Sequence, residues 1–320
     1  VAIDPADVGA RLALARSFFT ERDFTQASEH IQQILKRYPR QLGANVLAAD
    51  IALIEGDTEQ ARKVYDFLVK SFPKSPVGYF KLGLLEEKEK NSEKAIEWYE
   101  KTLKFDRGVL NPGRRYVKLL SASGMSIPDI IEKIQNLRTA SKNQKAEFDM
   151  LIGSLVLANT EDPNRFNKAR KLFLGTIESN PNLIGAYFAL GAIDAVSGDL
   201  DAAAGNYQIL LEKKPNHIPT MMLLALTREQ QKKYDEAIKA YRAALKVAPR
   251  FGPAANNLAW LLAEEVEDAD LNEALKLAEI AKEELPKEAS VADTLGWIHF
   301  KRKSPRVALP LLQEAVDLHR

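Results

Sequence analysis

Residues 292–301 read ADTLGWIHFK, a segment with the composition of a helix and a glycine, Gly296, at its centre. Glycine inside a helix costs about 1 kcal/mol relative to alanine, so its presence needs a physical reason. The largest side chain found in proteins, Trp297, follows it directly. We infer that Gly296 lets a second helix approach closely, and that a leucine there would overfill the contact at a cost of about 1–3 kcal/mol.

The same small residue recurs along the chain at a regular interval. Leu295-Gly296 has counterparts at Leu14-Ala15, Ala48-Ala49, Leu82-Gly83, Ile152-Gly153, Leu190-Gly191, Leu224-Ala225 and Leu258-Ala259. Prolines keep the same period of 34 residues, from Pro39 to Pro73 and from Pro181 through Pro215 to Pro249, with Pro286 after a further 37. An alanine lies twelve residues before each of these prolines, at Ala27, Ala61, Ala169, Ala203, Ala237 and Ala274.

This period predicts a repeated pair of helices. Each pair buries only part of its apolar surface by itself, so successive pairs must stack on one another. The pattern resembles the tetratricopeptide repeat, which implies an all-α, right-handed superhelical solenoid of about nine helix–turn–helix units over residues 1–320. The predicted units are 8–41, 42–75, 76–109, 110–145, 146–183, 184–217, 218–251, 252–288 and 289–320.

Some units depart from the pattern. Unit 110–145 lacks the alanine and proline signatures, so we expect a distorted pair there. Units 146–183 and 252–288 carry extra polar residues around 160–167 and 266–270, which should lengthen the connection between their helices. The last unit has no polar capping helix after it, so Leu311, Leu312 and Val316 are expected to form an uncovered face that would permit self-association. Since the chain starts at Val1, a longer natural protein is expected.

Composition excludes several classes of function. The 45 Lys and Arg residues nearly balance the 44 Asp and Glu residues, which argues against nucleic acid as a partner. There is no cysteine, and therefore no disulfide or thiolate chemistry. No apolar run approaches the roughly 18 residues of a membrane span.

The sequence also predicts no catalytic, cofactor or metal site. The four histidines are isolated, adjacent acids such as Glu264-Glu265 point in different directions on a helix, and each Leu-Gly pair lies inside a helix instead of a phosphate-binding loop. We therefore expect a protein that is not an enzyme.

Binding is the function that the resemblance implies, in a concave groove lined by the first helix of each unit. Its fifth and ninth positions supply Phe80, Leu84, Arg114, Lys118, Phe188, Met222, Leu226, Asn256, Trp260, Asp293 and Trp297. One hypothesis is that Phe188, Met222, Trp260 and Trp297 form an apolar stripe for a peptide segment. The alternative is that these side chains fill the space between neighbouring helices as core. Similarly, Arg114, Arg115 and Lys118 are either a basic spot for a carboxylate or phosphate, or a solvated helix face.

A finer resemblance concerns the last two units. NNLAWLLAEE at 256–265, followed by ADTLGWIHFKRK, resembles repeats of bacterial proteins linked to exopolysaccharide export and envelope protein sorting. This implies a noncatalytic scaffold for a protein or peptide partner, periplasmic or envelope-associated, with a cytoplasmic location as the alternative. Two other functions stay open: a substrate-recruiting accessory module of an enzyme or secretion machine, and a groove for polysaccharide. The Lys and Asn residues with which some family members clamp acidic chaperone tails are missing.

Overall fold

The computed structural model describes residues 7–105, 107–265 and 271–319, which contain eighteen helices and no strands. The prediction of an all-α fold is therefore confirmed for the described residues. The chain divides into two compact parts, Val1–Ala169 and Arg170–Arg320, here called the N-terminal and C-terminal parts. Each part is described by itself. The prediction that residues 1–320 form one domain stays a prediction.

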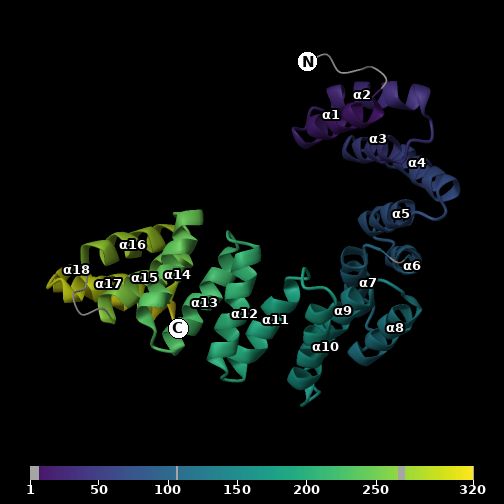
Figure 1. Ribbon diagram of the computed structural model, residues 1–320. Helices are drawn as coiled ribbons and strands as arrows, with labels where there is room; N and C mark the ends of the chain where they lie inside the picture. The colour runs from purple at the N-terminus through teal and green to yellow at the C-terminus, as the bar shows by residue number, and fades with distance from the viewer. Residues whose placement is uncertain (1–6, 106, 266–270, 320) are drawn as a thin grey trace. The chain divides into compact units, whose positions relative to one another are not determined.

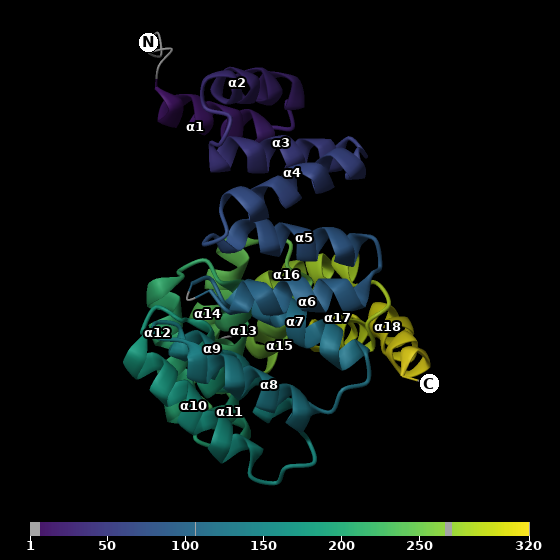
Figure 2. The same cartoon turned by 90° about the vertical axis from the view of Figure 1, so that its right-hand side faces the viewer.

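The N-terminal part consists of helices that follow one another as short antiparallel pairs (Figure 1). They are α1 (Val8–Thr20), α2 (Phe24–Arg37), α3 (Leu42–Ile54), α4 (Thr58–Ser71), α5 (Pro76–Lys88), α6 (Ser92–Leu103), α7 (Leu110–Ala122), α8 (Ile127–Ala140), α9 (Lys145–Ala158) and the first residues of α10 (Arg165–Ser179). Figure 2 shows α1 to α6 stacked layer upon layer, each layer being one pair.

The C-terminal part continues the same alternation. Its helices are the rest of α10, α11 (Gly185–Val196), α12 (Leu200–Lys213), α13 (Ile218–Gln230), α14 (Tyr234–Val247), α15 (Gly252–Glu264), α16 (Leu271–Glu284), α17 (Ala289–Lys301) and α18 (Pro305–Leu318). Odd-numbered helices are the first of each pair and are called A helices below; even-numbered helices are B helices. Each predicted unit corresponds to one such pair, except that α9 begins at Lys145, one residue before the predicted boundary.

Close approach between paired helices depends on the glycine of the A helix. A Cβ atom built at Gly83 would lie 2.5 Å from Cε1 of Tyr99 on the paired B helix. At Gly296 it would lie 2.9 Å from Cγ of Leu312 and 3.1 Å from the Leu312 backbone nitrogen. The contact predicted at Gly296 is therefore confirmed, and the side chain that needs the space is Leu312.

B-helix tyrosines form a core position that the sequence analysis did not single out. They lie four residues after the signature alanine and are fully buried at Tyr65, Tyr99, Tyr207 and Tyr241. The signature alanines are themselves completely buried, because a larger side chain would separate the two helices.

The turn between paired helices has a residue with positive φ at the fifteenth position of the unit. These residues are Arg22, Gly56, Lys90, Gly124, Gly198, Lys232 and Lys303, with φ between 58° and 91°. Arginine or lysine in this left-handed conformation costs about 1–2 kcal/mol. Because the same geometry occurs with and without glycine, packing of the two helices imposes the turn.

The degenerate fourth unit differs in its packing, as predicted. α8 packs more extensively against α9 than against its own partner α7. α7 also contacts α9 directly, where Gly113 leaves room for the side chain of Leu151.

The two predicted insertions have different outcomes. The extra residues near 160–167 lie in the connection between α9 and α10, although Phe166 and Asn167 already belong to α10. The insertion at 266–270 lies outside the described residues.

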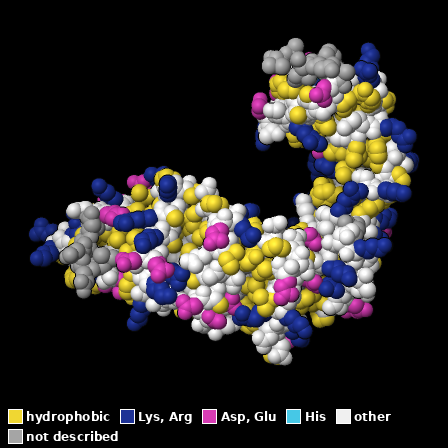
Figure 3. All heavy atoms as spheres, in the orientation of Figure 1, with side chains coloured by type: hydrophobic (Ala, Val, Ile, Leu, Met, Phe, Trp, Pro, Cys, Tyr) yellow, Lys and Arg dark blue, Asp and Glu magenta, His cyan; other side chains and the backbone are white. Residues whose placement is uncertain are grey.

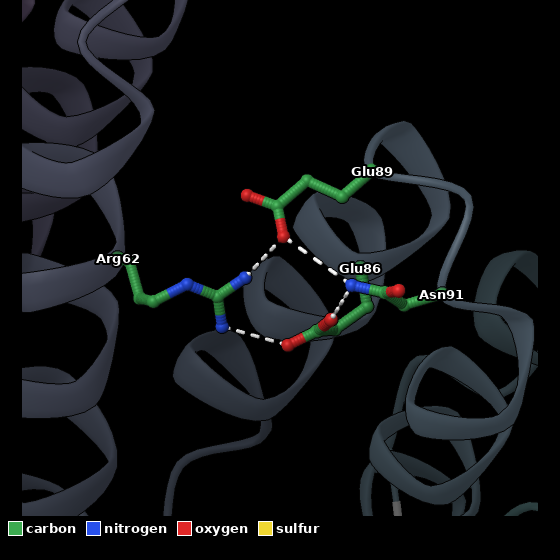
Figure 4. Close-up of polar contacts among 4 residues, drawn as sticks. All are labelled: Arg62, Glu86, Glu89 and Asn91. Atoms are coloured by element: carbon green, nitrogen blue, oxygen red, sulfur yellow. Dashed lines mark hydrogen bonds and ion pairs between the residues drawn. The ribbon is translucent and has the colours of Figure 1, made fainter.

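Charged residues link neighbouring pairs at two places. Glu86 of α5 is only 2% exposed and accepts a hydrogen bond of 2.7 Å from Nη1 of Arg62, which lies on the preceding B helix (Figure 4). Asn91 donates to the other Glu86 oxygen at 2.9 Å, and Glu89 accepts from Arg62 Nη2 at 2.6 Å. The junction thus holds a buried carboxylate with each of its oxygens bonded.

The second place repeats this arrangement in the C-terminal part. Asp194 of α11 is buried, pairs with Arg170 of α10 and accepts a hydrogen bond of 2.9 Å from Nδ2 of Asn206. Arg62 and Arg170 each directly follow a signature alanine, and Glu86 and Asp194 each occupy the eleventh position of the next unit.

The outer side of α18 is partly uncovered. Val316 is exposed, whereas Leu311 and Leu312 are half-buried because both contact the α17 side of the stack. Of the three residues predicted to be uncovered, only Val316 is fully so. Self-association through this helix stays a prediction.

Candidate partner-binding surfaces

The most exposed aromatic side chains of the C-terminal part lie on two successive A helices. Trp260 of α15 is 40% exposed and Phe300 of α17 is 53% exposed. Trp297 is half-buried and stacks on Phe300, with ring centroids 5.3 Å apart and an interplanar angle of 24°. These three residues are called the aromatic surface. The alternative that Trp260 serves purely as core does not fit its exposure.

Polar contacts hold Trp297 in one orientation. Its indole Nε1 donates to Glu264, which lies one turn after Trp260 on α15. Lys301 Nζ lies 2.5 Å from Glu264 Oε1, donates to the Ala263 carbonyl at 2.8 Å and sits 5.9 Å from the Trp297 ring centroid. Partial burial opposes ionisation of Glu264, but the hydrogen bonds from Lys301 and Trp297 outweigh it and lower its pKa. The aromatic surface is therefore pre-organised, with little rotamer freedom to lose on binding.

The remaining predicted stripe residues are more buried. Phe188 of α11 is half-buried, packing edge-on against His217 at 6.2 Å and tilted against Tyr207 at 6.4 Å. Met222 of α13 packs against the core of the C-terminal part, whereas Leu226, one turn later, is exposed. Phe188 and Met222 thus contribute partly to packing, as the alternative interpretation held.

Two predicted polar residues of this surface differ in access. Asn256 of α15 is 9% exposed, and its Oδ1 has no hydrogen-bond partner among the described residues. Asp293 of α17 is exposed. A partner can reach Asp293 directly, whereas Asn256 offers almost no surface.

In the N-terminal part, the predicted residues line a pocket between α7 and α9. Arg114, Met150 and Ser154 border a pocket of about 240 Å³, with Leu151 and Leu155 among its apolar residues. Arg114 is exposed and makes no ion pair within the described residues. A cation beside an apolar pocket is suited to an acidic segment with an apolar anchor.

The predicted basic spot is smaller than expected. Arg115 Nη1 donates to Glu87 at 2.8 Å, and Glu87 also accepts from Tyr99 Oη at 2.7 Å. Burial opposes ionisation of Glu87, yet the hydrogen bonds from Tyr99 and Arg115 lower its pKa, with a further contribution from the charge of Lys118. Arg115 is therefore neutralised internally, which leaves Arg114 and Lys118 as the exposed cations.

The other two predicted residues of this part are half-buried. Phe80 packs against the Tyr99 ring with centroids 5.9 Å apart, and Leu84 lies one turn further along α5.

Sequence reasoning missed a ladder of ion pairs between successive A helices. Lys81 donates to both oxygens of Asp50, at 2.8 and 2.6 Å, and Tyr65 donates to the same carboxylate at 2.7 Å. Lys81 and Arg115 lie 34 residues apart, one repeat period, and each pairs with an acid on the preceding A helix. That shared spacing was a signal available in the sequence.

Searches for other kinds of site found none in the part of the chain that the structure describes. No group of three or more His, Cys, Asp or Glu side chains there could hold a metal ion. None of the helices described is both long and apolar enough to cross a membrane. The face of the C-terminal part seen in Figure 3 mixes hydrophobic side chains with charges of both signs.

Comparison with known families supports the repeat assignment. Models described as Tetratricopeptide repeat match residues 12–76, 46–109 and 219–251. The chain therefore contains tetratricopeptide repeats, in both its N-terminal and its C-terminal part, as the sequence predicted.

Two curated relatives are similar along much of the chain. Protein CTR9 homolog of Arabidopsis thaliana is 23% identical and covers 98% of this chain and 29% of its own length. TPR repeat-containing protein MJ1428 of Methanocaldococcus jannaschii is 25% identical, over 70% of this chain and 34% of its own length. The chain thus spans about a third of the length of these relatives.

Among solved structures, the APC/C hetero-tetramer Cut9-Hcn1 is similar with a TM-score of 0.52 and 16% identity, covering 90% of this chain and 55% of that chain. This likeness supports the fold. The finer resemblance to bacterial envelope proteins stays a prediction.

Proposed function

We propose that this chain is a noncatalytic scaffold that binds protein partners through the exposed faces of its A helices. The observation that carries the proposal is the aromatic surface, where Trp260 and Phe300 stay 40% and 53% exposed on successive A helices. Large aromatic side chains dominate the energy of protein interfaces, because they bury much area at little entropic cost.

The geometry favours a partner segment with an apolar anchor. Trp297 is fixed by Glu264 and Lys301, so a partner that covers the Trp297–Phe300 stack need not order it first. The polar groups beside the rings provide the hydrated rim typical of an interface.

The N-terminal part supports the same kind of binding with different chemistry. The pocket beside Arg114 and the exposed Lys118 favour a segment in which an apolar residue adjoins an acidic one. We therefore propose two separate contact surfaces, one aromatic and one basic.

Selection of phage-displayed peptides on the full chain tests the aromatic surface. The selected peptides should lose about tenfold or more in affinity with Trp260→Ala or Phe300→Ala, which corresponds to at least 1.4 kcal/mol. Leu309→Ala, which removes an exposed apolar side chain from α18, is the matched control and should bind as the unaltered chain does. Unchanged affinity in both aromatic variants, with helical content retained, would contradict the proposal.

The finer part of the proposal concerns cellular context. The resemblance of residues 256–301 to bacterial envelope repeats supports a scaffold in an envelope or exopolysaccharide-related assembly. Fractionation of cells producing the native protein tests this, and recovery from the cytoplasm would contradict it. Binding of polysaccharide on Trp260, the other ligand class, would appear as quenching of tryptophan fluorescence that Trp260→Ala abolishes.

A further inference from the structure

One repeat junction carries an arginine where two others carry a buried acid. The eleventh position of the unit is Glu86 in α5 and Asp194 in α11, but Arg228 in α13. The residue that supplies the partner cation elsewhere, Arg62 or Arg170, corresponds here to Ala204 of α12. Alanine cannot reach across the junction, so Arg228 has no partner on the preceding repeat.

Arg228 is nearly buried, and its guanidinium is only partly engaged. It is 8% exposed, its Nε lies 2.9 Å from Glu236 Oε2, and its Nη1 donates to Gln231 Oε1 at 2.8 Å. Nη2 has no acceptor among the described residues. A nearly buried guanidinium can therefore still donate two hydrogen bonds to an added acceptor.

The guanidinium borders a pocket of about 400 Å³ between α12, α13 and α14. The apolar lining comes from Leu211, Met221, Leu224 and the small side chains of Ala240 and Ala243. This volume lies within the range of about 300–1,000 Å³ typical of ligand sites. An aliphatic side chain fits such a lining.

The rim of the pocket is polar. Gln208 and Lys239 are exposed at its edge, and Lys239 makes no ion pair within the described residues. Two cations, Arg228 and Lys239, and one anion, Glu236, thus surround the pocket, so its charge complements a carboxylate. The amide of Gln208 can bond to a peptide backbone at the rim, which a simple fatty acid would leave unpaired.

We propose that this pocket binds the free C-terminus of a partner chain that ends in an aliphatic residue. The terminal carboxylate accepts from Nη2 of Arg228, the last side chain fills the space beside Leu224 and Ala243, and the preceding backbone lies along Gln208 and Lys239. Glu236 competes with the incoming carboxylate for the guanidinium. The site lies away from the aromatic surface, so it is independent of the function proposed above.

Fluorescence anisotropy with a labelled hexapeptide ending in Ala-Leu tests the proposal on the full chain. The free-acid peptide should bind saturably, and the same peptide with an amidated C-terminus should bind about tenfold more weakly, because a charged hydrogen bond is lost. Equal binding of acid and amide would overturn the proposal. Displacement of the peptide by hexanoate at the same concentration as by unlabelled peptide would overturn a peptide C-terminus as the ligand.

Substitutions in the pocket should change affinity in opposite directions. Arg228→Met should weaken binding about tenfold, whereas Glu236→Gln should strengthen it, because the competing carboxylate is removed. Ala243→Leu should block the pocket without altering charge. Lys246→Ala, which removes an exposed lysine further along α14, is the matched control and should have no effect.

Arg228→Lys provides a second test if Arg228→Met unfolds, since it keeps the charge and loses the planar fork. Its affinity should fall between those of the unaltered chain and Ala243→Leu. Circular dichroism and the thermal midpoint would establish folding of each variant. Binding that is unchanged in folded Arg228→Lys and Ala243→Leu would overturn the proposal.

Discussion

Two repeat junctions occupy equivalent places in the pattern and are built from different charges. Before α5, Arg62 reaches across from α4 to the buried Glu86, and the junction is closed by an ion pair. Before α13, α12 has only Ala204, and Arg228 turns to Glu236 of its own repeat beside an open pocket. The comparison teaches that the repeat sets the spacing of helices, while one pair of side chains decides whether a junction is closed or open.

The largest effect is expected from exchanging the charge at the open junction. Arg228→Glu would place a nearly buried carboxylate beside Glu236 and should destabilise the surrounding repeats by about 3 kcal/mol. Ala204→Arg should then recover at least about 1 kcal/mol by recreating the pair of the closed junction. Urea denaturation of both single variants and the double variant measures the coupling, and strictly additive effects would contradict the equivalence of the two junctions.

A smaller loss is expected from breaking the closed junction. Arg62→Met leaves the Glu86 carboxylate buried with Asn91 as its remaining printed partner, at a cost of about 2 kcal/mol. Hydrogen exchange should accelerate in α5 and α6. Lys63→Met is the matched control, because Lys63 makes only an exposed pair with Glu59 and should matter by less than about 1 kcal/mol. Equal exchange in the two variants would show that the junction pair contributes nothing specific.

The asparagines that complete the two closed junctions should contribute about equally. Asn91 and Asn206 each donate an amide hydrogen bond of 2.9 Å to the junction carboxylate, Glu86 or Asp194. Substitution of either asparagine by alanine should cost about 1 kcal/mol. Thermal unfolding followed by circular dichroism compares them, and a loss in one variant only would mean that the two networks are not equivalent.

The smallest effect concerns pH. Burial opposes ionisation of Glu86, but hydrogen bonds from Arg62 and Asn91 lower its pKa, so its stabilisation is present above the unfolded pKa and is lost as pH falls through the folded one. Glu229 of α13 has its pKa raised, chiefly by burial, so its contribution is present below the unfolded pKa and is lost as pH rises through the folded one.

Matched variants separate these two carboxyl groups. Glu86→Gln should therefore destabilise at neutral pH, and Glu229→Gln should stabilise there. Both differences should shrink in acid, where the carboxyl groups of the unaltered chain are protonated. Urea denaturation across pH checks the signs, and the same sign at neutral pH for both variants would contradict this account.

Much of the fold was predictable because its determinants are local and periodic. The alanine before each proline and the small residue after Leu295 specified where helices pack, and the helix pairs lie where that period placed them. The buried tyrosines were missed, although Tyr65 and Tyr99 also lie 34 residues apart. Their importance became apparent only through the glycine that faces them.

The binding surfaces were only partly predictable. The sequence correctly placed Trp260 on an A helix, but periodicity carries no information on whether a neighbour covers it. Arg115 illustrates the same limit, since its charge is cancelled by Glu87 from the preceding A helix. Exposure and pairing depend on residues a full repeat away, which a pattern within one repeat does not describe.

The amino-acid sequence by itself determined the all-α class, the helix pairs and the tetratricopeptide repeats, because small side chains at a constant interval specify how closely two helices pack. The tertiary structure alone decided that Glu86 and Asp194 are closed by arginines while Arg228 lines an open pocket. The reason is physical: a helix contact depends on the size of one residue, whereas a charge depends on which partners can reach it.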